Sequence, residues 1–122
     1  MDILEKDMAA YKATALARWK SKQEKLDNRR KKAWAVAKKA SEFLKQKYHA
    51  KKVMIFGSMV HNYWYSETSD IDLAVWGINP DLYFNAIAEL QGISYDYKID
   101  MVSCEKADKN LLQSIFDEGK EL

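Results

Sequence analysis

Two aspartates that interrupt an apolar stretch constrain this chain more than any other feature. Asp70 and Asp72 stand one residue apart in SDIDLAVW. The apolar residues around them are typical of a buried strand, in which residues two apart point to the same face. A buried carboxylate without a partner is costly or takes up a proton, so we expect a cation beside this pair.

The surrounding sequence supplies no such cation, because neither Lys nor Arg occurs between residues 53 and 97. A divalent metal ion is the simplest candidate, and a site made only of oxygen ligands favours Mg²⁺ over zinc or copper. Asp100 interrupts another apolar stretch, YKIDMVS, and a strand beside the first would bring it to the same face. Three carboxylates on adjacent strands can hold two metal ions, one to activate an attacking oxygen and one to neutralise a leaving phosphate.

The pair Gly57-Ser58 follows the apolar run KVMIF. A glycine at a strand end lets backbone N–H groups approach an anion, and a helix that starts there adds its positive end, with the Ser58 hydroxyl as a further donor to phosphate. The alternative is an ordinary turn from strand to helix with a serine cap. The aspartates downstream favour phosphate binding.

The order of apolar runs and turn residues predicts an α+β domain. We expect a small mixed β-sheet, backed by helices, that carries the three aspartates on one side. The predicted elements are a strand ending at Gly57, a strand closed by Gly77, a helix from Asn79 to Gly92, a strand within SYDYKIDMVSC and a helix from Asp108 to Gly119. In the last helix we expect four inward-facing residues, Leu111, Leu112, Ile115 and Phe116.

The chain up to about Tyr48 contains neither Gly nor Pro and is rich in residues that favour helix. Apolar residues recur at steps of three and four at each end, namely Leu4, Met8, Tyr11, Ala15 and Trp19, and then Ala33, Ala37, Ala40 and Leu44. Between these stripes, residues 20–32 contain seven basic residues and only one apolar residue, Leu26. A break near Leu-Asp-Asn would give two helices, and its absence one long helix. We therefore predict a basic helical arm over residues 1–32 and a domain over residues 33–122.

Charge is distributed unevenly along the chain. Residues 1–50 hold 14 Lys and Arg against 6 Asp and Glu, a balance of +8, and residues 51–122 hold 6 against 12, a balance of −6. The basic stretch at residues 20–32 has three interpretations: a solvated helix face, a contact with nucleic-acid phosphates, or a docking surface for an acidic partner or a second copy of the chain. Trp19 and Trp34 flank it as interface anchors would, which favours a protein partner over nucleic acid.

Length and composition limit the remaining classes. A chain of 122 residues suits one compact domain, and no run of 18 apolar residues indicates a membrane span. The start MDILEKDMAA lacks the features of a secretory signal, and the single cysteine, Cys104, suits a reducing compartment and a packing role. We expect a cytoplasmic protein with no membrane contact.

The stretch GSMVHNYWYSETSDIDLAV resembles the Gly-Ser, spacer, Asp-x-Asp signature of the DNA-polymerase-β-like nucleotidyltransferases, most closely their minimal members (MNT). The resemblance extends over about residues 43–122 and includes the later aspartate in KIDMVS and the closing helix LLQSIFDEGKEL. It implies a nucleotidyltransferase domain in which Gly57 and Ser58 bind the triphosphate, Asp70 and Asp72 ligate Mg²⁺, and Asp100 completes the second metal position and helps to activate the acceptor hydroxyl.

The same resemblance implies transfer of a nucleoside monophosphate, expected to be AMP from ATP, with two Mg²⁺ ions and release of pyrophosphate. Many minimal members are antitoxins beside a HEPN-domain ribonuclease toxin, and some adenylylate a tyrosine on that toxin. We therefore expect an antitoxin that modifies a hydroxyl of a HEPN-type partner protein. Transfer to RNA ends or to a small antibiotic fits the same core, but 122 residues leave little room for a separate acceptor domain.

The chain departs from the family pattern after the Gly-Ser pair. Members usually continue with a basic residue and a glycine, whereas this chain continues as GSMVHN, and its spacer of eleven residues, 59–69, is one longer than usual. His61 is a candidate for the missing basic role or a plain exposed residue, and residues 63–65 (YWY) either stack on a base or partner or pack on the sheet. The departure supports a rival hypothesis, an inactive protein of this fold that neutralises its partner by binding.

Overall fold

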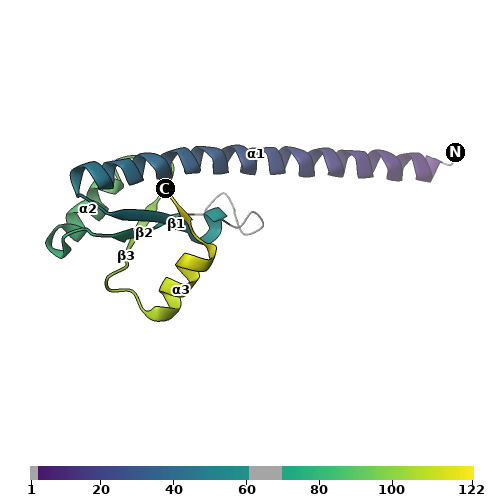
Figure 1. Ribbon diagram of the computed structural model, residues 1–122. Helices are drawn as coiled ribbons and strands as arrows, with labels where there is room; N and C mark the ends of the chain where they lie inside the picture. Colours follow the sequence, from purple (N-terminus) through teal and green to yellow (C-terminus); the bar gives the residue numbers. More distant parts are fainter. Residues whose placement is uncertain (1–2, 61–69) are drawn as a thin grey trace.

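A single long helix forms the N-terminal third of the chain. The computed structural model describes residues 3–60 and 70–122, and α1 extends without interruption over Ile3–Lys47 (Figure 1). Of the two alternatives for this region, one long helix is correct. The Leu-Asp-Asn stretch does not break it because none of these residues costs more than about 0.7 kcal/mol in a helix, whereas Gly and Pro, which cost more, are absent.

Within the described residues, four strands form one mixed sheet, which confirms the predicted fold class. The order in the sheet is β3-β2-β1-β4, with β1 antiparallel to both β2 and β4 and with β2 parallel to β3. The strands are β1 (Lys52–Phe56), β2 (Ile71–Trp76), β3 (Ile99–Ser103) and β4 (Lys120–Glu121). β4 was not predicted, because two residues are too few to show a period. The third strand is also shorter than predicted, since residues 95–97 form a bend.

Side-chain caps lie close to the two predicted helix starts, one at a 3-10 turn before α2 and one at α3. Asn79 accepts a hydrogen bond from the backbone N–H of Asp81 (3.0 Å) and opens a 3-10 turn, η2 (Pro80–Leu82), which leads into α2 (Tyr83–Leu90). Asp108 accepts from the backbone N–H of Leu111 (2.8 Å) at the start of α3 (Lys109–Glu118), which ends before Gly119. The two caps were readable in the sequence.

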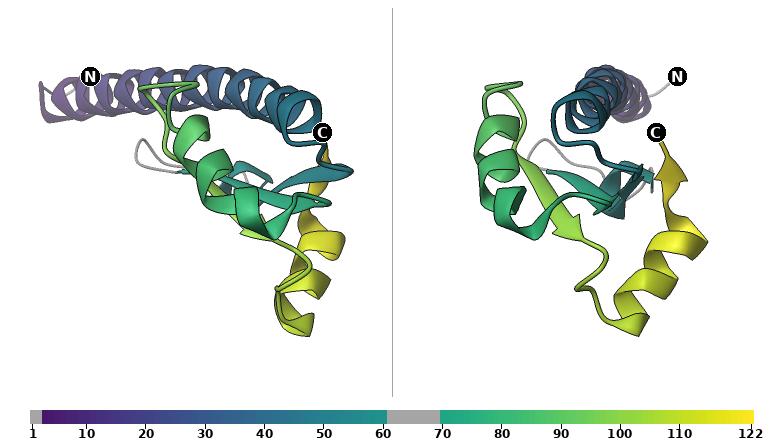
Figure 2. Two further views of the ribbon diagram at one scale, coloured as in Figure 1. Left: turned by 90° about the vertical axis from the view of Figure 1, so that its left-hand side faces the viewer. Right: turned by 60° about the vertical axis from the view of Figure 1, so that its left-hand side comes forward.

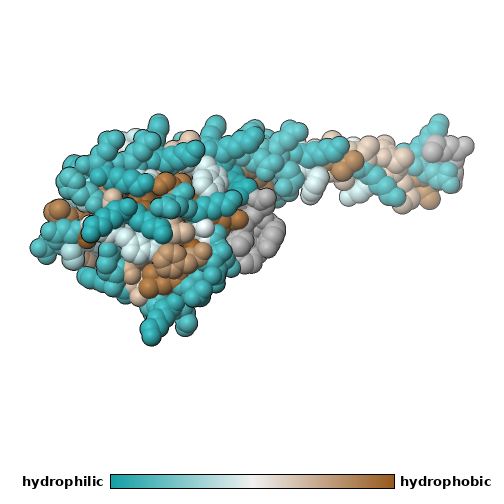
Figure 3. Space-filling view, in the orientation of Figure 1, coloured by the Kyte–Doolittle hydropathy of each residue, from teal (hydrophilic) through white to brown (hydrophobic). Residues whose placement is uncertain are grey.

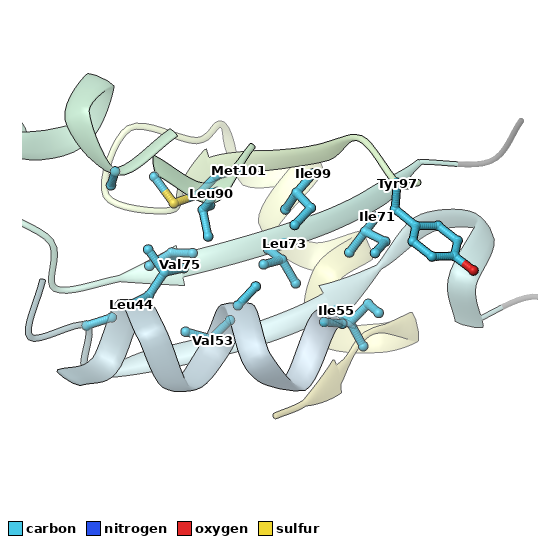
Figure 4. Packing of buried hydrophobic residues seen from close by; sticks show 14 of the residues in the cluster. Leu44, Val53, Ile55, Ile71, Leu73, Val75, Leu90, Tyr97, Ile99 and Met101 are labelled. Atoms are coloured by element: carbon cyan, nitrogen blue, oxygen red, sulfur yellow. The ribbon is translucent and has the colours of Figure 1, made fainter. Parts of the chain in front are cut away.

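The sheet separates two apolar clusters. The larger cluster lies between the sheet and helices α1 and α2, and Figure 4 shows Leu73 and Val75 of β2 in it with Leu44 of α1. The smaller cluster, on the α3 side, contains Met54, Ala74, Cys104 and Ile115. Figure 2 shows α3 on the side of the sheet away from α1. The packing role predicted for Cys104 is confirmed, since its side chain is buried.

One inward-facing residue of the last helix was predicted wrongly. Ile115 is fully buried, but Phe116 remains 53% exposed. Its ring lies 5.5 Å from that of Trp76, at the C-terminal end of β2. The helical period identified the correct face of α3, but the smaller cluster is too narrow to cover all four residues, so Phe116 packs at the rim.

The first half of α1 extends beyond the domain as a rod (Figure 1). All residues from 4 to 25 are exposed, and Leu26 is the first that packs against the core. In the described part of the chain, residues 3–60 and 70–122, no helix combines the length and the apolar character that crossing a membrane requires.

Candidate active site

The parallel pairing of β2 and β3 aligns two of the predicted aspartates. Asp72 and Asp100 are partners in the strand register, and Asp70 directly precedes β2. Along β2 the residues Ile71, Leu73 and Val75 point into the larger core, so Asp72 points to the opposite face. Asp72 and Asp100 are both of intermediate exposure. The structure therefore brings the two strand aspartates side by side, as the sequence predicted.

The Asp72 carboxyl shows how closely the three aspartates interact. Burial, the charge of Asp100 and the charge of Asp70, in that order of importance, raise its pKa from 3.8 to about 6. Desolvation and neighbouring negative charge both disfavour the ionised form of a carboxyl. At neutral pH the group is still mostly ionised, so this face concentrates negative charge that a bound cation would stabilise.

Gly57 lies directly against this carboxylate. Phe56 is the register partner of Asp72 across the antiparallel pair, and Gly57 follows with a φ of +76°. A Cβ atom on Gly57 would stand only 2.7 Å from Oδ2 of Asp72. Glycine is therefore required here both for the positive φ and for the close approach. The Gly-Ser turn and the aspartates, which are separate motifs in the sequence, form one site.

The described residues that directly follow β1 form a 3-10 turn. Residues Gly57–Val60 form the 3-10 turn η1, in which Met59 is buried and Ser58 is of intermediate exposure. The predictions for His61 and for residues 63–65 fall outside the described residues. The turn thus places Ser58 next to Gly57, the residue that lies against the Asp72 carboxylate.

Arg30 of α1 holds this turn from behind, and the sequence reading did not find it. Its Nε and Nη2 atoms donate to the backbone carbonyl of Met59 at 3.2 and 2.9 Å. The residue was assigned to the basic stretch at 20–32. Its position three residues before Ala33, on the inner stripe of the helix, was the available signal. Arg30 connects the long helix to the Gly-Ser turn, and the arginine that family members carry after that turn is absent here.

Lys98 is a second residue near the site that the sequence did not indicate, because it lies just beyond the stretch 53–97 that contains no Lys or Arg. Its Nζ lies 3.8 Å from Oδ1 of Asp100, with the two side chains 65% and 48% exposed. An ion pair this long and this exposed contributes little to stability. It lowers the pKa of Asp72 only as the last of four influences, so it does not neutralise the site.

The donor chemistry of the site suits a hard cation. Asp70, Asp72 and Asp100 offer only carboxylate oxygens, the ligands that Mg²⁺ prefers, and their mutual repulsion favours a positive ion between them. Over residues 3–60 and 70–122, however, no three side chains of His, Cys, Asp or Glu lie close enough together to form a ready metal site. The carboxylates lie near one another on one face of the sheet, but they do not converge on a single metal position.

Comparisons with known proteins agree with this arrangement. Residues 38–122 match the family model described as "Polymerase beta, Nucleotidyltransferase". No curated protein matches the chain. Among solved structures, a toxin–antitoxin with AMP-PNP is 22% identical with a TM-score of 0.57, covering 68% of this chain and 69% of that one.

Two further solved structures share the fold. The toxin–antitoxin MntA-HepT is 21% identical with a TM-score of 0.55, covering 72% of this chain and 69% of that one. The tri-AMPylated Shewanella oneidensis HEPN toxin in complex with MNT antitoxin is 20% identical with a TM-score of 0.54, covering 73% and 70%. At these identities the likeness establishes the fold of the domain.

Proposed function

We propose a function from the premise that this chain belongs to the polymerase β nucleotidyltransferase family. The protein transfers AMP from ATP to a hydroxyl group of a partner protein and releases pyrophosphate. One observation carries the proposal: Asp72 and Asp100 are register partners on adjacent strands, with Gly57 packed against the Asp72 carboxylate. A fold has no need of three mutually repelling carboxylates beside a glycine that admits no side chain, whereas a site for a metal-bound triphosphate does.

Each residue of the site has a distinct proposed role. Gly57 and Ser58 bind the triphosphate through backbone N–H groups and the hydroxyl, and Arg30 holds their turn in place through the Met59 carbonyl. Asp70, Asp72 and Asp100 would hold Mg²⁺, with Asp70 and Asp72 as the main ligands. Bound Mg²⁺ supplies charge neutralisation for the phosphates during transfer.

The reaction is a displacement at the α-phosphorus of ATP. The acceptor oxygen forms a bond to that phosphorus while the bond to the bridging oxygen of the β-phosphate breaks, so pyrophosphate leaves with the electron pair. The acceptor hydroxyl must lose its proton, and Asp100, the outermost of the two paired strand aspartates, is the proposed group that orients this hydroxyl and accepts the proton.

The proposed acceptor is a HEPN-type toxin, for which this protein would be the antitoxin. Support comes from two solved structures that share its fold: one is described as a HEPN toxin in the tri-AMPylated state with an MNT antitoxin, and the other as a toxin–antitoxin with AMP-PNP. Those proteins are about one-fifth identical to this chain, so partner and nucleotide remain proposals here.

The test is transfer of label from α-labelled ATP with Mg²⁺ to proteins of the host lysate. The wild type is compared with Asp70→Asn/Asp72→Asn and with the control Asp81→Asn, an exposed aspartate on η2. We expect a labelled protein band with the wild type and the control but not with the double variant. Label that is independent of Asp70 and Asp72, or no label at all, would contradict the proposal.

The rival function, neutralisation by binding alone, is favoured by GSMVHN, which lacks the basic residue and glycine usual after the Gly-Ser pair. The same double variant separates the two hypotheses when toxin activity is measured. An enzyme with both aspartates replaced leaves the toxin active. A binder keeps its effect, because the removed charges lie in the site and not on a contact surface.

A further inference from the structure

The first half of α1 carries exposed apolar side chains that do not belong to either apolar cluster of the described residues. We call residues 3–25 of α1 the overhang. Three large apolar residues in it, Met8, Tyr11 and Trp19, lie in a stripe on one side of the helix and are 55%, 77% and 59% exposed. Apolar patches along this rod are visible in Figure 3. Large apolar side chains that gather on one exposed surface mark interaction sites.

This stripe faces the same way as the face of α1 that packs on the sheet. An α-helix turns once every 3.6 residues, so residues 18 apart point in one direction. Met8, the partly buried Leu26 and the buried Leu44 are related in this way, and so are Ala15 and the buried Ala33. The stripe therefore overlooks the space beside the domain, on the side where the Gly57–Val60 turn lies (Figure 1).

We propose that the overhang of a second copy packs antiparallel along this stripe, so that the chain forms a two-fold symmetric dimer. The lengths agree, because the overhang ends where Leu26 begins to contact the core, and a helix of this length spans about 35 Å. With Met8 of one copy opposite Ala15 of the other, a large residue meets a small one at this level of the helix, and Tyr11 lies next to the two-fold axis. The N-terminus of each copy then ends near Trp19 of the other, before its domain.

Charge favours a second copy and an antiparallel direction. Between Met8 and Gln23 the overhang holds Lys12, Arg18, Lys20 and Lys22 and no acidic residue, and Glu24 and Lys25 at its end cancel. Its start holds Glu5 and Asp7 against Lys6, a balance of −1. An antiparallel pair brings the acidic start of each helix to the basic end of the other, and a parallel pair would oppose like charges. Asp7 and Arg18 are eleven residues apart, which is about three helical turns, so they lie on the same flank of the helix. In the antiparallel dimer, Asp7 of each copy therefore lies near Arg18 of the other copy.

Two alanines provide a matched test of this interface. Ala13 and Ala15 are both exposed, and their separation by two residues places them on opposite sides of the helix. We measure molar mass by sedimentation equilibrium over a range of concentrations. The wild type and Ala13→Glu are expected at twice the chain mass of 14.2 kDa, and Ala15→Glu at the single-chain mass. Equal behaviour of the two variants, or a monomeric wild type at every concentration, would overturn the proposal.

Charge exchange tests the direction of the helices. Asp7→Arg is expected to raise the dissociation constant of the dimer about three- to tenfold, and Asp7→Arg/Arg18→Asp to restore it within about twofold. A double variant that is weaker than both single variants would exclude the antiparallel arrangement. If the wild type is monomeric but an acidic helix from another protein requires Ala15 for binding, the stripe serves a different partner and the dimer is refuted. The outcome is independent of nucleotidyl transfer.

Discussion

The two faces of β2 make opposite contributions to the molecule. On one face Ile71, Leu73 and Val75 are at most 2% exposed in the larger core. On the other face the Asp72 carboxyl is partly desolvated beside Asp70 and Asp100, and its pKa rises to about 6. The apolar residues of the first face stabilise the fold. On the second face Ala74 packs in the smaller cluster, but the neighbouring carboxylates lower the stability. Residues that a strand keeps at a cost to stability are the ones to which function is most reasonably assigned.

The largest effect is expected from the apolar face. Leu73→Ala should lower the free energy of unfolding by about 2–5 kcal/mol, because Leu73 is fully buried and its loss leaves a cavity. The milder Ile71→Val should cost about 0.5–1.5 kcal/mol. Urea denaturation measures both variants. A loss below about 1 kcal/mol for Leu73→Ala would mean that this face is not the core of the domain.

The next largest effect should come from the point where the two motifs meet. Gly57→Ala should destabilise the protein by about 1–3 kcal/mol, because the φ of +76° is strained for alanine and the new Cβ meets the Asp72 carboxylate. Gly92→Ala is the control, since its Cβ would lie 3.4 Å from the Glu89 carbonyl and no positive φ is needed. Thermal unfolding measures the loss of stability in both variants. Equal losses would show that Gly57 has no special role.

A smaller effect is expected from the support behind the Gly-Ser turn. Arg30→Lys keeps the charge but cannot reproduce the two hydrogen bonds that converge on the Met59 carbonyl oxygen, so we expect a loss of about 1 kcal/mol. Nucleotidyl transfer should fall as well, because the turn that presents Gly57 and Ser58 is less firmly held. The reverse exchange at the exposed Lys38, Lys38→Arg, should leave both quantities unchanged. If Arg30→Lys changed neither stability nor nucleotidyl transfer, the turn would not depend on the hydrogen bonds from Arg30.

The smallest effect is the dependence of stability on pH. The pKa of Asp72 is about 6 in the folded chain against 3.8 for a free carboxyl. Between these values the folded state binds more protons than the unfolded state, so the contribution of this group to stability rises as pH falls from above 6 towards 4. After allowance for water around a half-exposed group, the change is about 1 kcal/mol. It should vanish in Asp72→Asn, and an unchanged slope in that variant would refute this origin.

The sequence predicted those parts of the molecule that depend on local patterns. The alternation in IDLAVW, the caps at Asn79 and Asp108, and the stop at Gly119 all depend on neighbours within a few residues, and the structure has them. The alignment of Asp72 with Asp100 was predicted because both interrupt apolar strands, so only the adjacency of these strands had to be assumed.

Other features depend on contacts between distant segments, and these were missed. Arg30 lies 29 residues before Met59, and only the docking of α1 on the sheet joins them. Phe116 fits the inward face of its helix, but the extent of the cluster beneath decides its exposure. The helical conformation of the overhang was predicted from its sequence and is present in the structure. Its contacts were not predicted, because they depend on a second molecule.

The most direct test of the contrast between the faces of β2 is the free energy of unfolding of the wild type and Asp72→Asn, each with and without Mg²⁺ and a non-hydrolysable ATP analogue. Without ligand, Asp72→Asn should be the more stable by about 1 kcal/mol, because a repelling charge is removed. With ligand at about 100 times its dissociation constant, the wild type should gain about 2.7 kcal/mol and the variant little. An equal gain in both proteins, or none in the wild type, would contradict the assignment of this face to metal-bound nucleotide.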